Sequence, residues 1–454
     1  MTALVRSAER PGWAGRKGVV MGSFGMSEEV VELRARMKDF IDDVVMKAEP
    51  ELERLSEQGY HPETGIPLEL YELAEQRGDD PVRGVRGLGL EGAMRGRRNT
   101  GPLADLKAEA KARGLWALGH PKEIGGGGLP FMDFVYLNEI IGRSEFGQVA
   151  VGTATMQDSI MLHQYANDLQ RSQYLAPMVD GRIYPSVGLT EPAVAGSDPT
   201  QMQTTADLDG DEWVINGRKW FTSGATRAAY TTVFAKTDPD NEKHFQFSAI
   251  IVPTDTPGYL IQRAVPTMGH VGGQHCEVVY DNVHVPAANL LGERGRGFLI
   301  SQKRLGPGRI FHCMRWLGQA QRAFELMCDR ALTRHAHGTL LAEKGVIQQM
   351  VAESAAEIQG SRLMTLDAAR ALDAGGEARV EISLIKFHGA KMLHNVIDRA
   401  IQVHGALGVT SDRPLDKMYR EARYARLYDG PDEVHHMVVA RNLLKNYKNR
   451  APWS

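Results

Sequence analysis

Residues 187–197 read VGLTEPAVAGS, and further along the chain residues 219–224 read KWFTSG. The first stretch offers backbone N–H groups and hydroxyls to an oxygen-rich ligand. The second places Trp220 two residues before Thr222, which puts both side chains on one face of a regular strand. A planar heteroaromatic cofactor needs a flat apolar wall and a few placed hydrogen-bond partners. A buried tryptophan beside a surface threonine is the alternative interpretation.

The surroundings of these two stretches are rich in β-branched and aromatic residues. Short runs such as EWVI, RKWF, TTVFAK, FSAIIV and CEVVY are separated by turn signals, which is typical of strands. Asn216-Gly217, between two such runs, predicts a hairpin. We therefore expect residues 184–296 to form a small all-β domain, either a barrel or a sandwich.

Helical periodicity dominates on both sides of this domain. Ser27 is a plausible N-cap before Glu28 and Glu29, and apolar residues then recur at helical spacing. We expect an N-terminal helical domain over residues 27–183 and a C-terminal four-helix bundle over residues 297–454. Residues 1–26 are expected to be a loose arm, and the Gly- and Arg-rich residues 78–101 an exposed excursion. The predicted fold class is α+β.

Composition excludes several classes of function. The net charge is −3 and no long Lys/Arg run occurs, so nucleic acid is not an expected partner. The three cysteines form no CxxC pair, and His435-His436 face different sides of a helix, so neither a disulfide framework nor a metal site is predicted. No apolar run is long enough for a membrane span or a secretory signal. We expect a cytoplasmic protein.

Two short motifs have competing interpretations. GLGLEG (87–92) matches GxGxxG, but no buried strand precedes it and no apolar helix follows, so a Rossmann site is not expected. RLYDGPDEVHH (426–436) places Asp429 before a Gly-Pro break and a new helix. Asp429 is either a helix cap or a functional carboxylate, and these residues alone leave both open.

Taken together, the motifs resemble those of the acyl-CoA dehydrogenase family of flavoproteins, from about Ser27 to Asn449. TEPAVAGSD (190–198), RLGPGRIFHCMRWLG (304–318) and DGPDEVH (429–435) resemble in particular the branch of acyl-CoA dehydrogenase family members ten and eleven. The resemblance departs at four positions. His337 replaces the usual Phe, Ala406 a frequent Gly, Pro431 a Thr and Asp429 the Glu of straight-chain members.

The resemblance implies FAD as cofactor. It assigns FAD contacts to Val187, Gly188, Leu189, Thr190, Ser197, Trp220, Phe221, Thr222, Arg334, Gln402, Gly405 and Glu433. Trp220 and Thr222 would pack against the isoalloxazine ring, whereas Arg334 and the Gln402 stretch would serve the cofactor of a neighbouring subunit. A homodimer or homotetramer is therefore expected.

The resemblance also implies the reaction. Asp429 would remove the α proton of an acyl-CoA, with Ser197, Arg309 and Gly430 near the substrate, to give a trans-2-enoyl-CoA. An electron-transferring flavoprotein would accept the electrons. Burial between the flavin and the acyl chain should raise the pKa of Asp429, and ligand binding should raise it further. Two alternatives are a flavin-dependent monooxygenase of the same fold and a non-catalytic acyl-CoA- or flavin-binding protein.

Overall fold

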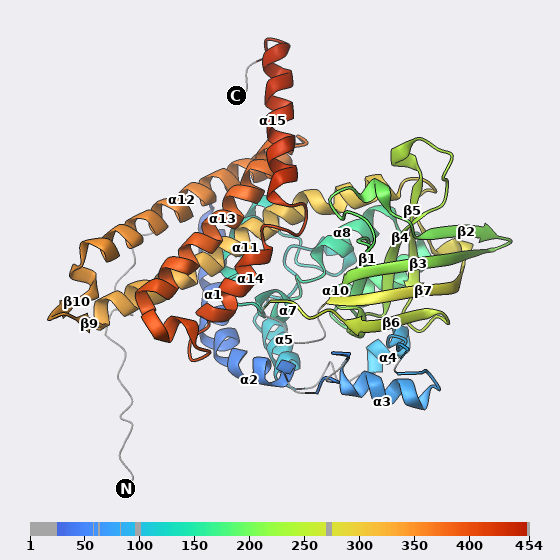
Figure 1. The fold of residues 1–454 in the computed structure, drawn as a ribbon, viewed down its shortest axis with the longest axis horizontal. Coiled ribbons are helices and arrows are strands. Elements are labelled where there is room, and N and C mark those ends of the chain that lie inside the picture. Colours follow the sequence, from blue (N-terminus) through green and yellow to red (C-terminus); the bar gives the residue numbers. More distant parts are fainter. Residues whose placement is uncertain are drawn as a thin grey trace, which may run out of the picture.

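The computed structural model describes residues 25–57, 59–61, 64–81, 83–95, 101–268 and 275–451. A β sheet lies at one side of the molecule and a helical bundle at the other, with the N-terminal helices along both (Figure 1). The predicted order of helices, sheet and helices is confirmed, and so is the α+β fold class. The predicted arm, residues 1–26, lies outside the described residues except for Gly25 and Met26.

The N-terminal part is a set of short helices. They are α1 (Glu28–Phe40), α2 (Met46–Glu57), α3 (Leu68–Gln76), α4 (Gly89–Arg95), α5 (Pro102–Ala112), α6 (Phe131–Ile141), α7 (Gly147–Ala150), α8 (Met156–Tyr165), α9 (Asp168–Gln170) and α10 (Ala176–Val179). Ser27 caps α1 as predicted, because its side chain accepts a hydrogen bond from the N–H of Val30. Helix α6 is buried from Phe134 to Ile141, against α1 and a long helix of the bundle.

The central sheet contains eight strands. They are β1 (Pro185–Gly188), β2 (Thr205–Asp209), β3 (Glu212–Ser223), β4 (Tyr230–Lys236), β5 (Phe247–Pro253), β6 (Tyr259–Ala264), β7 (His275–Pro286) and β8 (Leu290–Leu291). Their order is β6-β7-β3-β2-β4-β5-β8, and β1 pairs in parallel with β4. Strand β1 leads directly into the 187–197 loop, so the position of that loop is fixed by the middle of the sheet.

The predicted hairpin at Asn216-Gly217 is wrong. Both residues lie inside β3, and the turn between β2 and β3 is at residues 210–211. A β-bulge against β7 falls between Ile215 and Gly217. Gly217 has a φ of +155°, and a Cβ there would overlap Thr204. The glycine is needed for a bulge and a close approach, and not for a turn.

Residues 83–95 pack against the sheet, so the expectation of an exposed excursion is wrong for this part. Val85 is fully buried and pairs with Ile261 of β6. The N–H of Gly89 donates to Thr254 Oγ1 at 2.8 Å, and a Cβ on Gly89 would overlap the Asp255 side chain. The GLGLEG glycines thus allow close packing against the turn after β5. Residues 82 and 96–100 lie outside the described residues.

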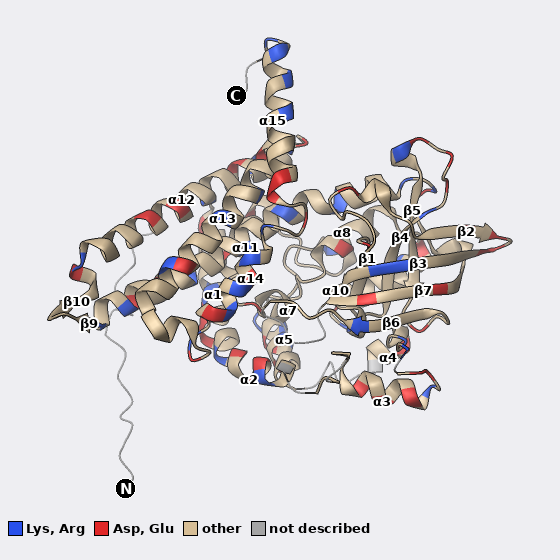
Figure 2. Cartoon of the chain, in the orientation of Figure 1, with Lys and Arg blue, Asp and Glu red and all other residues tan. Residues whose placement is uncertain are grey.

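The C-terminal part is a helical bundle. Its helices are α11 (Gly297–Thr333), α12 (Gly345–Asp373), α13 (Arg379–His404), α14 (Leu415–Tyr424) and α15 (Asp432–Lys448). Helix α13 contacts the other four, and a small hairpin of β9 (His335–Ala336) and β10 (Thr339–Leu340) closes one end. The last turns of α15 project from the bundle and carry basic residues (Figure 2). None of the described helices is both long and apolar enough to cross a membrane.

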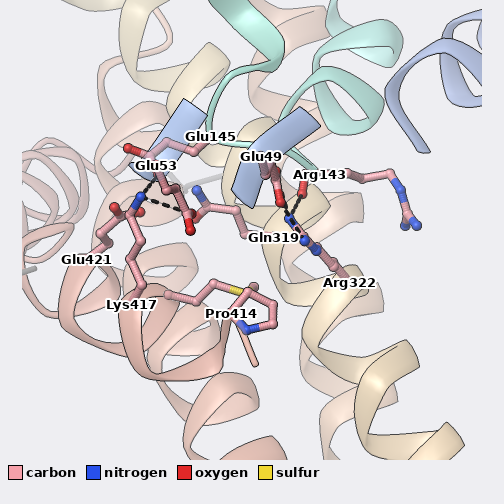
Figure 3. Close-up of a pocket in the computed structure, with 10 residues that line it drawn as sticks. Glu49, Glu53, Arg143, Glu145, Gln319, Arg322, Pro414, Lys417 and Glu421 are labelled. Carbon is pink, nitrogen blue, oxygen red and sulfur yellow. Dashed lines mark hydrogen bonds and ion pairs between the residues drawn. The ribbon is translucent and has the colours of Figure 1, made fainter. Parts of the chain in front are cut away.

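Ion pairs join the N-terminal helices to the bundle around a cavity of about 20 Å³ (Figure 3). Arg322 of α11 contacts Glu49 of α2 at 2.7 Å. Lys417 of α14 contacts Glu53 at 3.1 Å and Glu145 at 2.6 Å. These contacts fix the helix that precedes residues 425–430, where the predicted base lies.

Candidate active site

A buried ion pair anchors the 187–197 loop to β3. Lys219 Nζ lies 2.8 Å from Glu191 Oε1, and their side chains are 0% and 3% exposed. Glu191 also accepts hydrogen bonds from the N–H groups of Gln203 and Thr204, at 2.6 Å and 2.9 Å. Lys219 donates in addition to the carbonyl of Leu189 at 3.1 Å. The two motifs that the sequence singled out are therefore held together by one buried contact.

Burial shifts the pKa of both partners in this pair. Burial lowers the pKa of Lys219 to about 8, although the charge of Glu191 opposes the shift. Burial raises the pKa of Glu191, but Lys219 and the backbone donors outweigh it, so the net direction is downward. Both groups are charged at neutral pH. This pair could not be predicted from the sequence, because the two residues are far apart in the chain.

Trp220 and Thr222 lie beside this loop with unpartnered polar atoms. The backbone N–H of Trp220 donates to the carbonyl of Thr190 at 3.0 Å. Among the described residues, Trp220 Nε1 and Thr222 Oγ1 are buried without a hydrogen-bond partner. A β-bulge between Lys219 and Thr222 interrupts the regular alternation, so the reason given for one shared face does not hold. Phe221, with a φ of +50°, is 41% exposed.

The other predicted residues of the loop differ in exposure. Gly188 is buried, Val187 and Leu189 are half-buried, and Ser197 is exposed. A Cβ on Gly188 would lie 3.0 Å from the Tyr280 hydroxyl. The loop thus leaves the sheet at a tightly packed glycine and reaches the surface at Ser197.

Asp429 lies in a turn that the surrounding side chains hold from several directions. Its φ is +53° and that of Gly430 is +99°. Arg309 Nε donates to the Asp429 carbonyl at 2.9 Å, and His435 Nε2 lies 3.2 Å from the same oxygen. Buried Lys386 donates to the carbonyl of Ala425 at 2.7 Å. A non-glycine residue in the left-handed region persists only where its surroundings hold it there.

The Asp429 carboxylate does not cap the following helix. The N-cap of α15 is Pro431, and no side chain caps it. The carboxylate instead faces α11, where His312 Nε2 lies 3.2 Å from Asp429 Oδ2. The two side chains are 23% and 19% exposed.

The residues of the chain itself lower the pKa of Asp429. Burial does raise this pKa, but contact with His312 and the positive charges of Arg309 and Arg304 lower it further. The result is a pKa well below the usual range, so the carboxylate is ionised at neutral pH. His312 and Arg304 were not predicted as site residues. The one feature of the sequence that could have indicated them is that both lie with Arg309 in the RLGPGRIFH stretch.

Arg304 connects this turn to the side of the sheet. Its guanidinium lies 3.2 Å from the Asp158 carboxylate of α8. Asp158, and more weakly Asp429 and Tyr230 of β4, raise the pKa of Arg304 against the opposing effect of burial. Tyr230 pairs in register with Pro185, at the start of β1. Arg304 therefore lies between the Asp429 turn and strand β4, which pairs with β1.

The remaining predicted cofactor residues are in two other places. Glu433 is exposed in the first turn of α15. Arg334 directly precedes β9, and Gln402 and Gly405 lie at the C-terminal end of α13; all three are exposed. The β9–β10 hairpin and the sheet that carries Trp220 lie at opposite sides of the molecule (Figure 1).

A basic cluster, Arg330, Arg334 and Arg413, forms at this far end. Burial lowers the pKa of Arg330, and the positive charges of Arg334 and Arg413 lower it further. Arg330 Nε is buried without a hydrogen-bond partner among the described residues. Burial lowers the pKa of His404, the residue before Gly405, and the nearby charges of Arg330 and Arg413 lower it further. Three like charges with a buried unpaired donor suit an anionic ligand.

Models of three protein domains match this chain in order. They are the acyl-CoA dehydrogenase N-terminal domain over residues 92–182, the middle domain over residues 186–283 and the C-terminal domain over residues 295–444. Together they cover the sheet and most of both helical parts.

Individual relatives give the same result. The chain is 41% identical to a probable acyl-CoA dehydrogenase, FadE2, of Mycobacterium tuberculosis, over 94% of this chain and 98% of that protein. It is 36% identical to mouse acyl-CoA dehydrogenase family member 10, over 97% of this chain but 39% of that longer protein. A solved structure from Mycobacterium abscessus, assigned to the acyl-CoA dehydrogenases, superposes with a TM-score of 0.79 at 36% identity and covers 93% of this chain and 99% of that one.

Proposed function

This chain belongs to the acyl-CoA dehydrogenase family of FAD-binding flavoproteins, and we propose that it converts an acyl-CoA to the trans-2-enoyl-CoA with Asp429 as the base. The observation that carries the proposal is the Asp429 carboxylate. It is ionised, largely buried, held in a strained turn and free of any capping role.

The residues around β3 fit FAD. Buried Trp220 Nε1 and Thr222 Oγ1 have no partner among the described residues, and they lie beside a loop with available backbone groups. A flavin ring system offers the flat surface and the acceptors that such atoms require. When bound, FAD supplies the acceptor for the hydride that leaves the β carbon. We propose that Val187, Gly188, Leu189, Thr190, Ser197, Trp220, Phe221 and Thr222 contact it.

Asp429 would take the α proton of the thioester. This proton is weakly acidic, so a carboxylate removes it only where the thioester carbonyl is polarised and water is excluded. We propose that the backbone N–H of Asp429 polarises the carbonyl and that Arg309 holds the turn through its bond to the Asp429 carbonyl, 2.9 Å long. Ser197 and Gly430 would border the substrate.

The lowered pKa of Asp429 has a consequence for the reaction. A strongly ionised carboxylate is always ready to accept a proton but is a weak base. An acyl-CoA and the flavin would exclude water from Asp429, which raises its pKa from this low starting value. We therefore expect substrate binding to increase the basicity of Asp429.

The basic cluster at the far end of the bundle supports a shared cofactor site. The β9–β10 hairpin, which Arg334 precedes, lies at the opposite side of the molecule from strand β3, which carries Trp220 (Figure 1). The neighbouring Arg330 leaves a buried donor for an anion. We propose that this end binds the diphosphate of a neighbour's FAD, and that Glu433, at the start of α15, contacts FAD at a separate place. The protein would then be a homodimer or homotetramer, and we expect a cytoplasmic enzyme that passes electrons to an electron-transferring flavoprotein.

The test compares Asp429→Asn with Asp429→Glu. Asn keeps the size and the tolerance of a left-handed φ, so the variant should fold and keep FAD. Flavin bleaching by an acyl-CoA under anaerobic conditions should fall by about 10²- to 10⁴-fold, the usual contribution of a general base. Asp429→Glu should regain part of the rate, because it restores a carboxylate with a different reach.

Three outcomes would contradict the proposal. Bleaching by Asp429→Asn at the normal rate would remove the base from the mechanism. A protein that is never bleached by acyl-CoA thioesters from butyryl-CoA to palmitoyl-CoA, but consumes oxygen once its flavin is reduced, would favour the monooxygenase alternative. A colourless protein that binds acyl-CoA would favour the non-catalytic one.

A further inference from the structure

His312 makes a contact on each side of its ring. Nε2 lies 3.2 Å from Asp429 Oδ2, and Arg315 Nη2 lies 2.8 Å from Nδ1. His312 and Arg315 are three residues apart on α11, so they are neighbours on one face of the helix. Three groups thus lie in series, from Arg315 through His312 to Asp429.

The chemistry of Arg315 decides which ring nitrogen carries the proton. A guanidinium only donates hydrogen bonds, so Nδ1 of His312 must accept. Burial lowers the pKa of Arg315 to about 10, and it remains charged at neutral pH. Burial and the charge of Arg315 also lower the pKa of His312. A neutral His312 with an accepting Nδ1 has its proton on Nε2, the ring nitrogen that lies 3.2 Å from Asp429 Oδ2.

Aromatic neighbours hold the plane of the His312 ring. Trp316 lies 6.2 Å away between ring centroids at an interplanar angle of 29°, and Tyr428 lies 5.1 Å away. Trp316 Nε1 donates to the Tyr428 hydroxyl at 2.8 Å, which links these two rings. Because Tyr428 precedes Asp429, the same cluster positions the histidine and the residue that it faces.

From this geometry we propose that His312 is a positioning residue for Asp429, with its tautomer fixed by Arg315. Oδ2 is buried and has no completed hydrogen bond among the described residues, so the Nε2–H of His312, 3.2 Å away, is the group placed to restrain rotation of the carboxylate about its last bond. Oδ1 is then the oxygen presented to the α proton. This role rests on the proposed function of Asp429 as base.

The first experiment separates a donor from a space-filling ring. His312→Gln places an amide N–H near the position of Nε2, whereas His312→Leu removes the donor and keeps an apolar side chain. Anaerobic flavin bleaching should slow about 10- to 100-fold in His312→Leu, the usual effect of losing a hydrogen bond to an ionised group. It should stay near the native rate in His312→Gln, with the change in the rate constant at saturating acyl-CoA and not in apparent affinity.

A matched control is available on α13. His388 is also half-buried, and its Nδ1 lies 3.1 Å from Ser361 Oγ. His388→Leu should leave bleaching unchanged. Equal slowing in His312→Leu and His312→Gln would overturn the proposal in favour of a packing role. Native bleaching rates in both His312→Leu and His312→Gln, while Asp429→Asn is inactive, would overturn the role of His312 and leave Asp429 as the proposed base.

The second experiment reads the tautomer without any turnover. Nitrogen NMR of isotope-labelled histidine distinguishes a protonated Nε2 from a protonated Nδ1, and His312→Gln identifies the signal among the 15 histidines. The native protein should show Nε2–H, and Arg315→Met should show a mixture. A native Nδ1–H tautomer would overturn the assignment even if Asp429 proved not to be the base.

Discussion

The most severe single substitution that we predict outside the base is Lys219→Met. Methionine keeps the length and apolar stem of lysine but removes the ammonium group. Glu191 would then be 3% exposed with no cation beside it. Removing one partner of a buried pair costs about 3–5 kcal/mol, because the remaining charge is uncompensated. The two backbone N–H donors to Glu191, at 2.6 Å and 2.9 Å, stay in place, so we expect the lower end, about 3 kcal/mol.

The cost should depend on pH in a specific direction. Without Lys219, burial would raise the pKa of Glu191 above its unfolded value. Such a group contributes stability below its unfolded pKa and loses it as pH rises through the folded pKa. The difference in free energy of unfolding between Lys219→Met and the native protein should therefore be smaller in acid than at neutral pH. The double variant Glu191→Gln with Lys219→Met removes both charges and should recover most of the lost stability.

Urea unfolding followed by tryptophan fluorescence measures the loss, and gel filtration followed by absorbance measures retained FAD. Because Glu191 and Lys219 connect the 187–197 loop to β3, FAD should be lost before the helices unfold. Unfolding of Lys219→Met within about 0.5 kcal/mol of the native protein, as for a surface substitution, would refute the reasoning. So would a double variant that is no better than the single one.

Three further predictions concern other parts of the chain. Burial lowers the pKa of His120 from 6.5 to about 4, so the free energy of unfolding should fall by up to about 3 kcal/mol as pH drops from 6.5 toward 4; His120→Gln should flatten that part of the curve, and an unchanged slope would contradict the prediction. Arg334→Ala should release FAD on gel filtration with an unchanged circular dichroism spectrum, and full flavin content would argue against the shared site. Gly89→Ala should destabilise the fold by about 1–3 kcal/mol, because its φ is +67° and a Cβ would overlap Asp255; Gly92→Ala, at an ordinary φ, is the control in thermal melts, and equal melting temperatures would refute the packing argument.

Sequence periodicity predicted the parts of the fold that depend on neighbouring residues. The Ser27 cap and the order of helices, sheet and helices all follow from patterns within a few residues. The hairpin predicted at Asn216-Gly217 was wrong because the conformation there depends on residues that are distant in the sequence. A dipeptide that favours a turn was placed inside a strand because β7 and Thr204 pack around it, and nothing within the local sequence indicates either neighbour.

The sequence named candidate site residues, but the charges around them could not be predicted. Asp429 could be found from its own motif, yet the direction of its pKa depends on His312, Arg309 and Arg304, which come close to it only in the folded chain. Glu191 and Lys219 were within the quoted motifs, but their contact depends on the path of the loop after β1. Long-range contacts of this kind have no periodic signature.

Helix α11 fixes the distance between the Asp429 turn and the basic cluster at the far end of the bundle. It runs without interruption through 37 residues and carries Arg315 and Arg330 about 22 Å apart at about 1.5 Å per residue. Inserting one residue between them would turn the far cluster by about 100° relative to His312. Gene duplicates and engineered chimeras of this fold should therefore keep the number of residues between Arg315 and Arg330 in α11 unchanged.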